Sequence, residues 1–343
     1  MPFAGEPGRH NAITDVDGVL VGYTTLIAGE DVRTGVTAVL PRPHASMATP
    51  VFAGFHSLNG NGELTGTLWV AEAGRLAGPV TITNTHSCGT ARDASIKWLA
   101  ANGGVIDAFA LPVAGETYDG YLNDINGFHV CDEHVFAAIE QAAGGAIEEG
   151  SVGGGTGMIC YGYKGGSGTA SRKIAFAGAT YHVGAFVQAN FGRREQLTIA
   201  GVPVGRALGA TAGDAERGSV IGIVATDAPF MPHQLQRLAR RVGLGIGRSG
   251  AISGHGSGDI FLAFSTANAA AHHEEELLAE LNFIPNCHID RFFDGVIQAV
   301  DEAVVNSLFA NTTMTGRDGH VVDALPHADA IAALSAHGVV LDR

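Results

Sequence analysis

The stretch Ser253-Gly254-His255-Gly256-Ser257-Gly258-Asp259-Ile260-Phe261-Leu262-Ala263-Phe264 joins a glycine-rich turn to an apolar run. Residues 260–264 predict a strand that is buried on both faces. Gly256 has no Cβ, so the peptide bond before Ser257 can be strained and closely approached. The Ser257 hydroxyl can then attack the Gly256 carbonyl to give an ester. Hydrolysis of that ester would free the serine α-amine, whose pKa near ~8 suits a base beside its own hydroxyl.

Taken alone, this segment leaves other interpretations open. Gly218-Ser219 also precedes an apolar strand, and most Gly-Ser pairs are only turns. The glycine-dense residues 151–168 resemble a phosphate-binding loop, but no Gly-Lys-Ser/Thr follows, so tight turns between strands are favoured.

The elements around this segment predict an α+β protein. Strands and helices are mixed without regular βαβ repeats, which favours helices packed on mixed or antiparallel sheets in a layered sandwich. No linker or repeat divides the chain, so residues 1–343 are expected to form a single domain. Strands are predicted over residues 19–23, 35–40, 79–84, 174–190, 219–226 and 259–264, and helices over 90–101, 134–143, 232–247 and 290–309.

Composition excludes several classes of protein. Of 343 residues, 46% are hydrophobic and 16% are charged, which is too apolar for a disordered chain. The net charge of −14 offers no basic patch for nucleic acid. No run of 18 apolar residues predicts a membrane span. Four widely spaced cysteines without a CxxC motif, and an N-terminus without signal-peptide features, predict reduced thiols in a cytoplasmic protein.

Common catalytic motifs are missing from the sequence. It has no GxSxG, no HExxH and no GxGxxG after a strand. Residues 129–134 and 272–276 gather His, Cys, Asp and Glu side chains that can bind metals. The first group is better explained as a polar turn before a helix, and the second as a solvated helix face. We therefore expect no metal and no cofactor.

Five stretches of the sequence carry a joint pattern: Leu58-Asn59-Gly60-Asn61-Gly62-Glu63, Thr83-Asn84-Thr85-His86-Ser87, Glu116-Thr117-Tyr118-Asp119-Gly120, residues 152–158 and residues 256–268. Together they resemble the DmpA/BapA aminopeptidases, which comprise L-aminopeptidase/D-esterases and β-peptidyl aminopeptidases of peptidase family S58. The resemblance runs from Asn11 to Gly319. It implies an αββα sandwich that is self-cleaved into residues 1–256 and 257–343, with chemistry similar to that of N-terminal nucleophile hydrolases.

The resemblance also implies roles for individual residues. Cleavage between Gly256 and Ser257 makes Ser257 the nucleophile. Glu116 and Tyr118 match the substrate pocket, and Asn190 matches the oxyanion-hole asparagine. A carboxylate such as Glu116 can pair with a substrate ammonium, and an asparagine amide can donate to an oxyanion. Tyr118 can donate to the same oxyanion or to a substrate carbonyl. Each residue also has a purely structural interpretation. Glu116 would then be a surface acid, Asn190 an asparagine in a turn, and Tyr118 a tyrosine at the edge of the core.

One position departs from the family pattern. The family places a serine and a carboxylate two residues apart on the late helix, where this chain has Ala299 and Asp301. At about 100° per residue, Asp301 lies about 80° from the centre of the apolar stripe and Glu302 about 180° from it. We therefore expect Asp301 to hold the Ser257 amine and Glu302 to face solvent.

Together these features predict a self-processing serine aminopeptidase. Its acyl-enzyme would form on Ser257 with small peptides, amides or esters that carry a free amine. Hydrolysis of non-peptide amide oligomers and acyl transfer are alternatives on the same scaffold. A non-catalytic binding remnant is a further alternative, favoured by Ala299, and an intact chain of 35.2 kDa would support it. A homo-oligomer of processed heterodimers is expected, whereas the preferred amino acid and its stereochemistry are not predicted.

Overall fold

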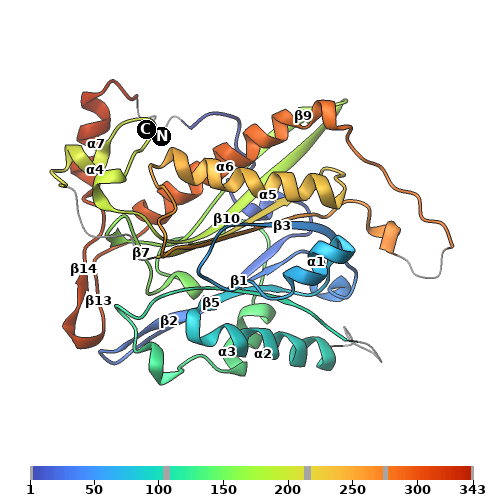
Figure 1. The fold of residues 1–343 in the computed structure, drawn as a ribbon, viewed down its shortest axis with the longest axis horizontal. Helices are drawn as coiled ribbons and strands as arrows, with labels where there is room; N and C mark the ends of the chain where they lie inside the picture. The colour runs from blue at the N-terminus through green and yellow to red at the C-terminus, as the bar shows by residue number, and fades with distance from the viewer. Residues whose placement is uncertain (1–2, 103–108, 212–217, 273–276, 341–343) are drawn as a thin grey trace.

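The fold has four layers, in the order helices, sheet, sheet, helices (Figure 1). The computed structural model describes residues 3–102, 109–211, 218–272 and 277–340. The predicted αββα sandwich is confirmed by this arrangement, because each sheet carries helices on its outer face and packs against the other sheet on its inner face.

The larger sheet has six strands in the order β4-β3-β12-β11-β10-β9. The β11–β12 pair is parallel and the other pairs are antiparallel. The strand predicted after Ser257 is β12, in the interior of this sheet. The bounds are β3 (Val51–Gly60), β4 (Arg75–Leu76), β9 (Gly166–Phe176), β10 (Ala179–Asn190), β11 (Ser219–Thr226) and β12 (Gly258–Ser265).

The smaller sheet has four strands in the order β1-β2-β5-β6. Here the β5–β6 pair is parallel, and the other two pairs are antiparallel. The bounds are β1 (Leu20–Ala28), β2 (Val32–Leu40), β5 (Val80–Asn84) and β6 (Val113–Thr117).

Strand β12 is buried on both faces, as its apolar sequence predicts. Phe261 and Ala263 face the core beneath the outer helices, whereas Leu262 and Phe264 face the core between the sheets. This alternation follows from the two-residue period of a strand. Ser257, immediately before β12, is fully buried as well.

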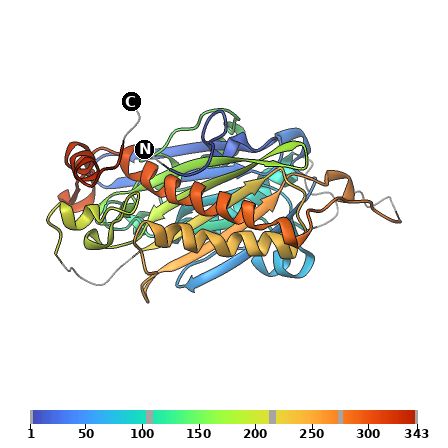
Figure 2. The same cartoon turned by 90° about the horizontal axis from the view of Figure 1, so that it is seen from above.

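Two long helices cover the six-stranded sheet. They are α5 (Pro232–Arg248) and α6 (Asp290–Phe309), and they lie side by side across it (Figure 2). Pro232 occupies the first turn of α5, where its missing N–H costs no hydrogen bond. The helices α2 (Cys88–Ala101) and α3 (Asp132–Glu140) cover the four-stranded sheet. Shorter elements complete the described chain: α1 (Thr67–Ala73), α4 (Val204–Ala207), α7 (His327–Ala336), β7 (Ile159–Cys160), β8 (Tyr163–Lys164), β13 (Met314–Thr315) and β14 (Val321–Val322).

The single strand predicted over residues 174–190 is wrong. The chain turns back at Ala177 and Gly178, which separate β9 from β10 in an antiparallel hairpin. Both turn residues have positive φ, +52° and +80°. A two-residue hairpin turn requires this conformation, which glycine adopts without steric cost and alanine rarely adopts. Because alanine is uncommon at such a turn position, the sequence pattern did not predict the turn.

The glycine-dense stretch packs between the sheets. Gly153–Gly155 form a short 3-10 helix after a tight turn. A Cβ at Gly154 would lie 2.2 Å from the Gln188 side chain and 2.6 Å from the Ile82 carbonyl oxygen. This close approach supports the prediction that these glycines are structural.

Candidate active site

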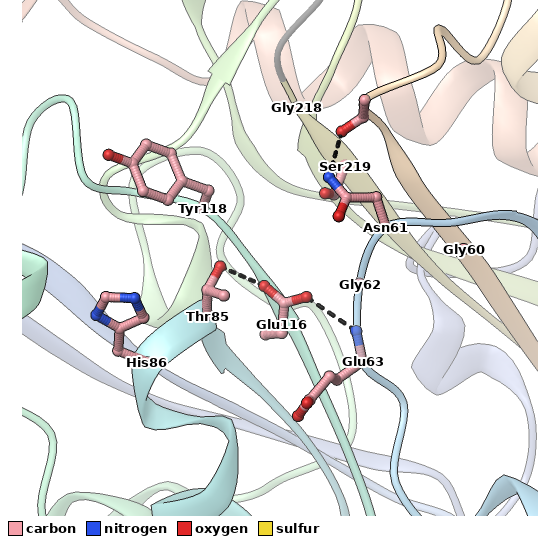
Figure 3. A pocket seen from close by; sticks show the side chains of 11 residues that line it. Gly60, Asn61, Gly62, Glu63, Thr85, His86, Glu116, Tyr118, Gly218 and Ser219 are labelled. Atoms are coloured by element: carbon pink, nitrogen blue, oxygen red, sulfur yellow. Dashed lines mark hydrogen bonds between the residues drawn. The ribbon is translucent and has the colours of Figure 1, made fainter.

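The ends of several strands meet at one edge of the sandwich. Asn190 pairs with Ser219, Ser219 with Gly258, and Gly258 with Gly60, so four neighbouring strands of the larger sheet end at the same level. Glu116, near the end of β6, belongs to the facing sheet. A cavity of about 880 Å³ opens there (Figure 3), and its wall includes Asn61, Glu63, Thr85, His86, Glu116, Tyr118, Ser219 and Gly256.

The predicted nucleophile lies at the start of β12. Ser257 is fully buried, and its hydroxyl donates a hydrogen bond to the Asp259 carboxylate (Oγ to Oδ1, 2.6 Å). Its backbone N–H donates to the Gly254 carbonyl oxygen (2.9 Å). Because Gly256 lines the cavity, the Gly256–Ser257 peptide bond is at the cavity wall.

Glu116 is a buried acid and not a surface acid. Only 2% of its surface is exposed. One carboxylate oxygen accepts a hydrogen bond from the Glu63 backbone N–H (3.0 Å), and the other accepts from the Thr85 hydroxyl (Figure 3). Burial raises the pKa of Glu116 above its ordinary value, although these two hydrogen bonds oppose the shift. A cationic group in the cavity would reverse that effect and favour the ionised carboxylate.

The side chain of Asn190 is hydrogen-bonded to the backbone of Tyr118, so the two residues lie close together. Figure 3 shows the Tyr118 ring across the cavity from Asn61 and Ser219. The ring is half-exposed, so it is no core-edge tyrosine. The Asn190 amide donates to the Tyr118 carbonyl oxygen (3.0 Å), and its Oδ1 accepts from the Ile159 N–H (2.8 Å). An asparagine amide has two N–H donors, so this bond to Tyr118 uses one of them.

The predictions for the late helix are partly wrong. Asp301 is buried, as its helical position predicts, but its carboxylate pairs with Arg248 (3.1 Å). Glu302 does not face solvent, because it binds Arg172 (2.6 Å) and accepts from the Asn11 side chain (2.8 Å). Within the described residues no contact of Asp301 reaches Ser257, so the structure gives no support to its predicted role at the serine amine.

Ala299 lies away from the cavity wall. It is fully buried in the apolar core that α6 forms with the six-stranded sheet. A serine there would need its own hydrogen-bond partner, which alanine does not. Alanine therefore fits the apolar packing at this position.

Asn61 and Asp259 are the residues that sequence reasoning missed. Asn61 Nδ2 donates to the Gly256 carbonyl oxygen (2.8 Å), and Asp259 accepts from the Ser257 hydroxyl. Both residues stand inside stretches that carry the family resemblance. The two-residue period of a strand would have placed Asp259 on the same side as Ser257.

No group of three metal-binding side chains occurs in the described part of the chain. His129 bonds to Asp124 (3.3 Å), and His134 bonds to its near neighbour Cys131 (3.2 Å). In the second predicted cluster, residues 273–276 fall outside the described residues. Among the helices of the described ranges, none is both long and apolar enough to cross a bilayer.

Two facing sheets between helical layers, with a serine immediately before an interior strand, match the variant of the Ntn hydrolase fold that the solved relatives have. The chain belongs to peptidase family S58, whose sequence profile matches residues 11–322.

Relatives and solved structures agree over nearly the whole chain. The β-peptidyl aminopeptidase of Sphingosinicella microcystinivorans is 49% identical over 97% of this chain and 90% of the relative. The L-aminopeptidase D-Ala-esterase/amidase of Ochrobactrum anthropi, described as a prototype of the serine aminopeptidases and a variant of the Ntn hydrolase fold, superposes with a TM-score of 0.93 at 44% identity, covering 99% and 98% of the two chains. A Burkholderia β-aminopeptidase gives a TM-score of 0.90 at 45% identity, covering 99% and 97%.

Buried carboxyl groups predict how stability depends on pH. Burial raises the pKa of Asp119 to about 7, of Glu149 to about 7 and of Asp301 to about 6. Between its unfolded value near 4 and its folded value, each group binds a proton in the folded state only. Each therefore lowers the free energy of unfolding as pH rises through that window, by up to about 1.4 kcal/mol per pH unit.

For the uncut Ser257→Ala chain, which is expected to unfold reversibly, the urea midpoint should be lower at about pH 7.5 than at about pH 5. Asp301→Asn, which cannot titrate, should reduce the difference between the two midpoints. An equal or higher midpoint at the higher pH would contradict the assigned pKa directions.

Proposed function

We propose that this protein is a self-processing serine aminopeptidase that acts on small peptides, amides or esters with a free N-terminal amine. The observation that carries the proposal is a buried carboxylate, Glu116, in the wall of the same cavity as the Gly256–Ser257 peptide bond. Burying an acid without a cation is costly, so a site that keeps one is suited to a substrate ammonium group. A binding remnant would have no need of such a group beside a nucleophile.

The proposed reaction begins once cleavage has made Ser257 the first residue of its chain. Its hydroxyl attacks the substrate carbonyl, and its own α-amine takes the proton and passes it to the leaving amine or alcohol. Water then hydrolyses the ester that links the acyl group to Ser257. Glu116 holds the substrate ammonium, while Asn190 and Tyr118 stabilise the oxyanion. The contact between Asn190 and the Tyr118 carbonyl supports a shared role.

The relatives narrow the substrate class. Their names describe β-peptidyl aminopeptidases and an L-aminopeptidase with D-Ala-esterase and amidase activity. A cavity of about 880 Å³ accommodates a substrate of one to a few residues. We therefore propose short substrates that are cleaved after their first residue.

The assembly and its location are part of the proposal. We propose a homo-oligomer of processed heterodimers in the cytoplasm. Leu277 and Leu278 support an oligomer, since 99% and 89% of their surfaces are exposed on the segment that reaches away from the body before α6 (Figure 1). Free thiols at Cys88, Cys131, Cys160 and Cys287 support a reducing compartment.

The function is tested by intact-mass measurement and a p-nitroanilide panel. The purified protein should contain two chains, residues 1–256 and 257–343, with serine as the N-terminal residue of the second. It should release nitroaniline from α- or β-aminoacyl p-nitroanilides and not from their N-acetylated counterparts. Two chains without any amidase or esterase activity would contradict the enzymatic proposal, whereas a single active chain would contradict self-processing.

A further inference from the structure

The loop before Ser257 is held by the end of a neighbouring strand. Residues 249–257 connect α5 to β12, and Asn59 near the end of β3 donates through Nδ2 to the Gly254 carbonyl oxygen (2.5 Å). The Ser257 backbone N–H donates a hydrogen bond to the same oxygen (2.9 Å). Within this loop Ser253 has a φ of +53°, a conformation that is uncommon for a residue with a side chain. The peptide bond before Ser257 is therefore fixed on its N-terminal side.

Asn61 contacts both peptide groups next to the serine. Its side-chain Nδ2 donates to the Gly256 carbonyl oxygen (2.8 Å), and its backbone N–H donates to the Ser257 carbonyl oxygen (3.3 Å). A hydrogen bond to a carbonyl oxygen strengthens as that oxygen gains negative charge. The amide of Asn61 is thus aimed at the atom that would carry the charge during cleavage after Gly256.

Asp259 contacts the hydroxyl that would attack. Oγ of Ser257 donates to Oδ1 of Asp259 at 2.6 Å, and both side chains are buried. This length is typical of an O–H donor bound to an ionised carboxylate. Before cleavage the nitrogen of Ser257 belongs to a peptide bond, and its lone pair is delocalised into the Gly256 carbonyl group, so the amine proposed as the base of the mature enzyme does not yet exist. The first cut needs a different base.

We propose that Asp259 and Asn61 are catalytic residues of the self-cleavage reaction. Asp259 takes the proton as Ser257 Oγ bonds to the Gly256 carbonyl carbon, and Asn61 stabilises the resulting oxyanion. When the bond between that carbon and the Ser257 nitrogen breaks, the nitrogen takes the proton from Asp259. Water then hydrolyses the ester, which leaves a carboxylate on Gly256 and a hydroxyl and free amine on Ser257. This inference rests on the proposed self-processing.

Two other carboxylates that were predicted to act at the site, those of Glu116 and Asp301, have other partners. Glu116 accepts from Glu63 and Thr85, and Asp301 pairs with Arg248. Asp259 is the carboxylate in contact with the Ser257 hydroxyl among the described residues.

Cleavage of freshly synthesised full-length chain, followed by intact mass, tests both residues. Asn61→Asp keeps the size of the side chain but replaces the donor with a charge, and Asn61→Ala removes the donor. Both should slow cleavage by about 100-fold or more. Asn59→Ala is the matched control, because it loosens the same loop without touching the Gly256 carbonyl. It should cleave within a few-fold of wild type.

Asp259 is tested through the pH dependence of cleavage. Asp259→Asn should cleave at least about 100-fold more slowly at neutral pH, with a rate that rises with pH as hydroxide replaces the lost base. Asp259→Glu, which keeps a carboxylate, should recover part of the rate. The thermal unfolding of each uncut variant identifies those that have failed to fold. A variant whose melting temperature is close to that of uncut Ser257→Ala is folded, so its cleavage rate can be compared with that of wild type.

The outcomes separate two failures. A wild-type chain that stays uncut would overturn self-processing and, with it, this inference. If wild-type chain is cut and the folded Asn61 and Asp259 variants are cut equally fast, only this inference is overturned. Equal slowing by Asn59→Ala and Asn61→Ala would also overturn the role of Asn61, since loop support would then explain both.

Discussion

Ser257→Ala is expected to leave one uncut chain without measurable activity. The substitution removes the hydroxyl that attacks Gly256 and the nucleophile of the mature enzyme in one step. Loss of a catalytic nucleophile lowers kcat by about a million-fold in comparable serine hydrolases. Because Ser257 is fully buried and small, alanine should fold normally, and the lost hydrogen bond to Asp259 should cost about 1–3 kcal/mol. Gel electrophoresis, intact mass and the p-nitroanilide assay provide the readouts.

The second Gly-Ser pair provides a matched control. Ser219 begins the parallel neighbour of β12, and its hydroxyl accepts from the Gly258 N–H (3.2 Å). Ser219→Ala should still be cut between Gly256 and Ser257. Cleavage that persists in Ser257→Ala and disappears in Ser219→Ala would transfer the assignment to the other serine.

Glu116→Gln should reduce kcat/KM by about 100- to 1,000-fold for substrates with a free amine. The change keeps the shape of the side chain and removes its charge, so a buried ammonium would lose its partner at a cost of about 3–4 kcal/mol. The loss should fall mainly on KM. Because burial raises the pKa of Glu116, wild-type KM should also increase as the pH is lowered and the carboxyl group becomes protonated.

Glu63→Gln is the control for Glu116. Glu63 lines the same cavity, but it touches Glu116 through its backbone N–H, which glutamine keeps. Its effect on kcat/KM should be smaller than that of Glu116→Gln, and loss of the Glu63 charge should lower the pKa of Glu116. N-acetylated substrates should respond little to either change. Equal kinetics of Glu116→Gln and wild type on free-amine substrates would contradict the ammonium role, and a Glu116→Gln chain that stays uncut would indicate a role in folding.

The sequence predicted those parts of the fold that depend on local pattern. The apolar run after Ser257 became β12, and the apolar stripes of residues 232–247 and 290–309 became α5 and α6. The resemblance supplied the αββα layers and placed Glu116 and Tyr118 at the same cavity as Gly256. The strand and helix predictions succeeded because the periodicity of burial can be read from consecutive residues.

The errors at the late helix and the missed site residues arose where residues distant in the sequence decide the outcome. Helical geometry predicted that Glu302 faces solvent. In the structure its carboxylate instead forms an ion pair with Arg172 on β9 and accepts a hydrogen bond from Asn11 in the N-terminal segment. The same geometry identified Asp301 as buried without revealing that Arg248 on α5 is its partner. Asn61 reaches the Gly256 carbonyl because β3 pairs with β12, a contact between residues 195 positions apart. One sequence without an alignment contains no signal for such pairs.

The position of β12 inside its sheet constrains how the two products of a cut before Ser257 could separate. Its neighbours on both sides, β3 and β11, belong to the larger chain, and α6 from the smaller chain packs against α5 from the larger one. The two products would therefore be interlocked, and separating them would mean breaking two hydrogen-bonded ladders and an apolar core at once. Folding would be unimolecular before the cut, whereas recovery from denaturant would require two separate polypeptides to meet. After processing, the lifetime of the native state would therefore be set by how slowly it unfolds, and no longer by a reversible folding equilibrium.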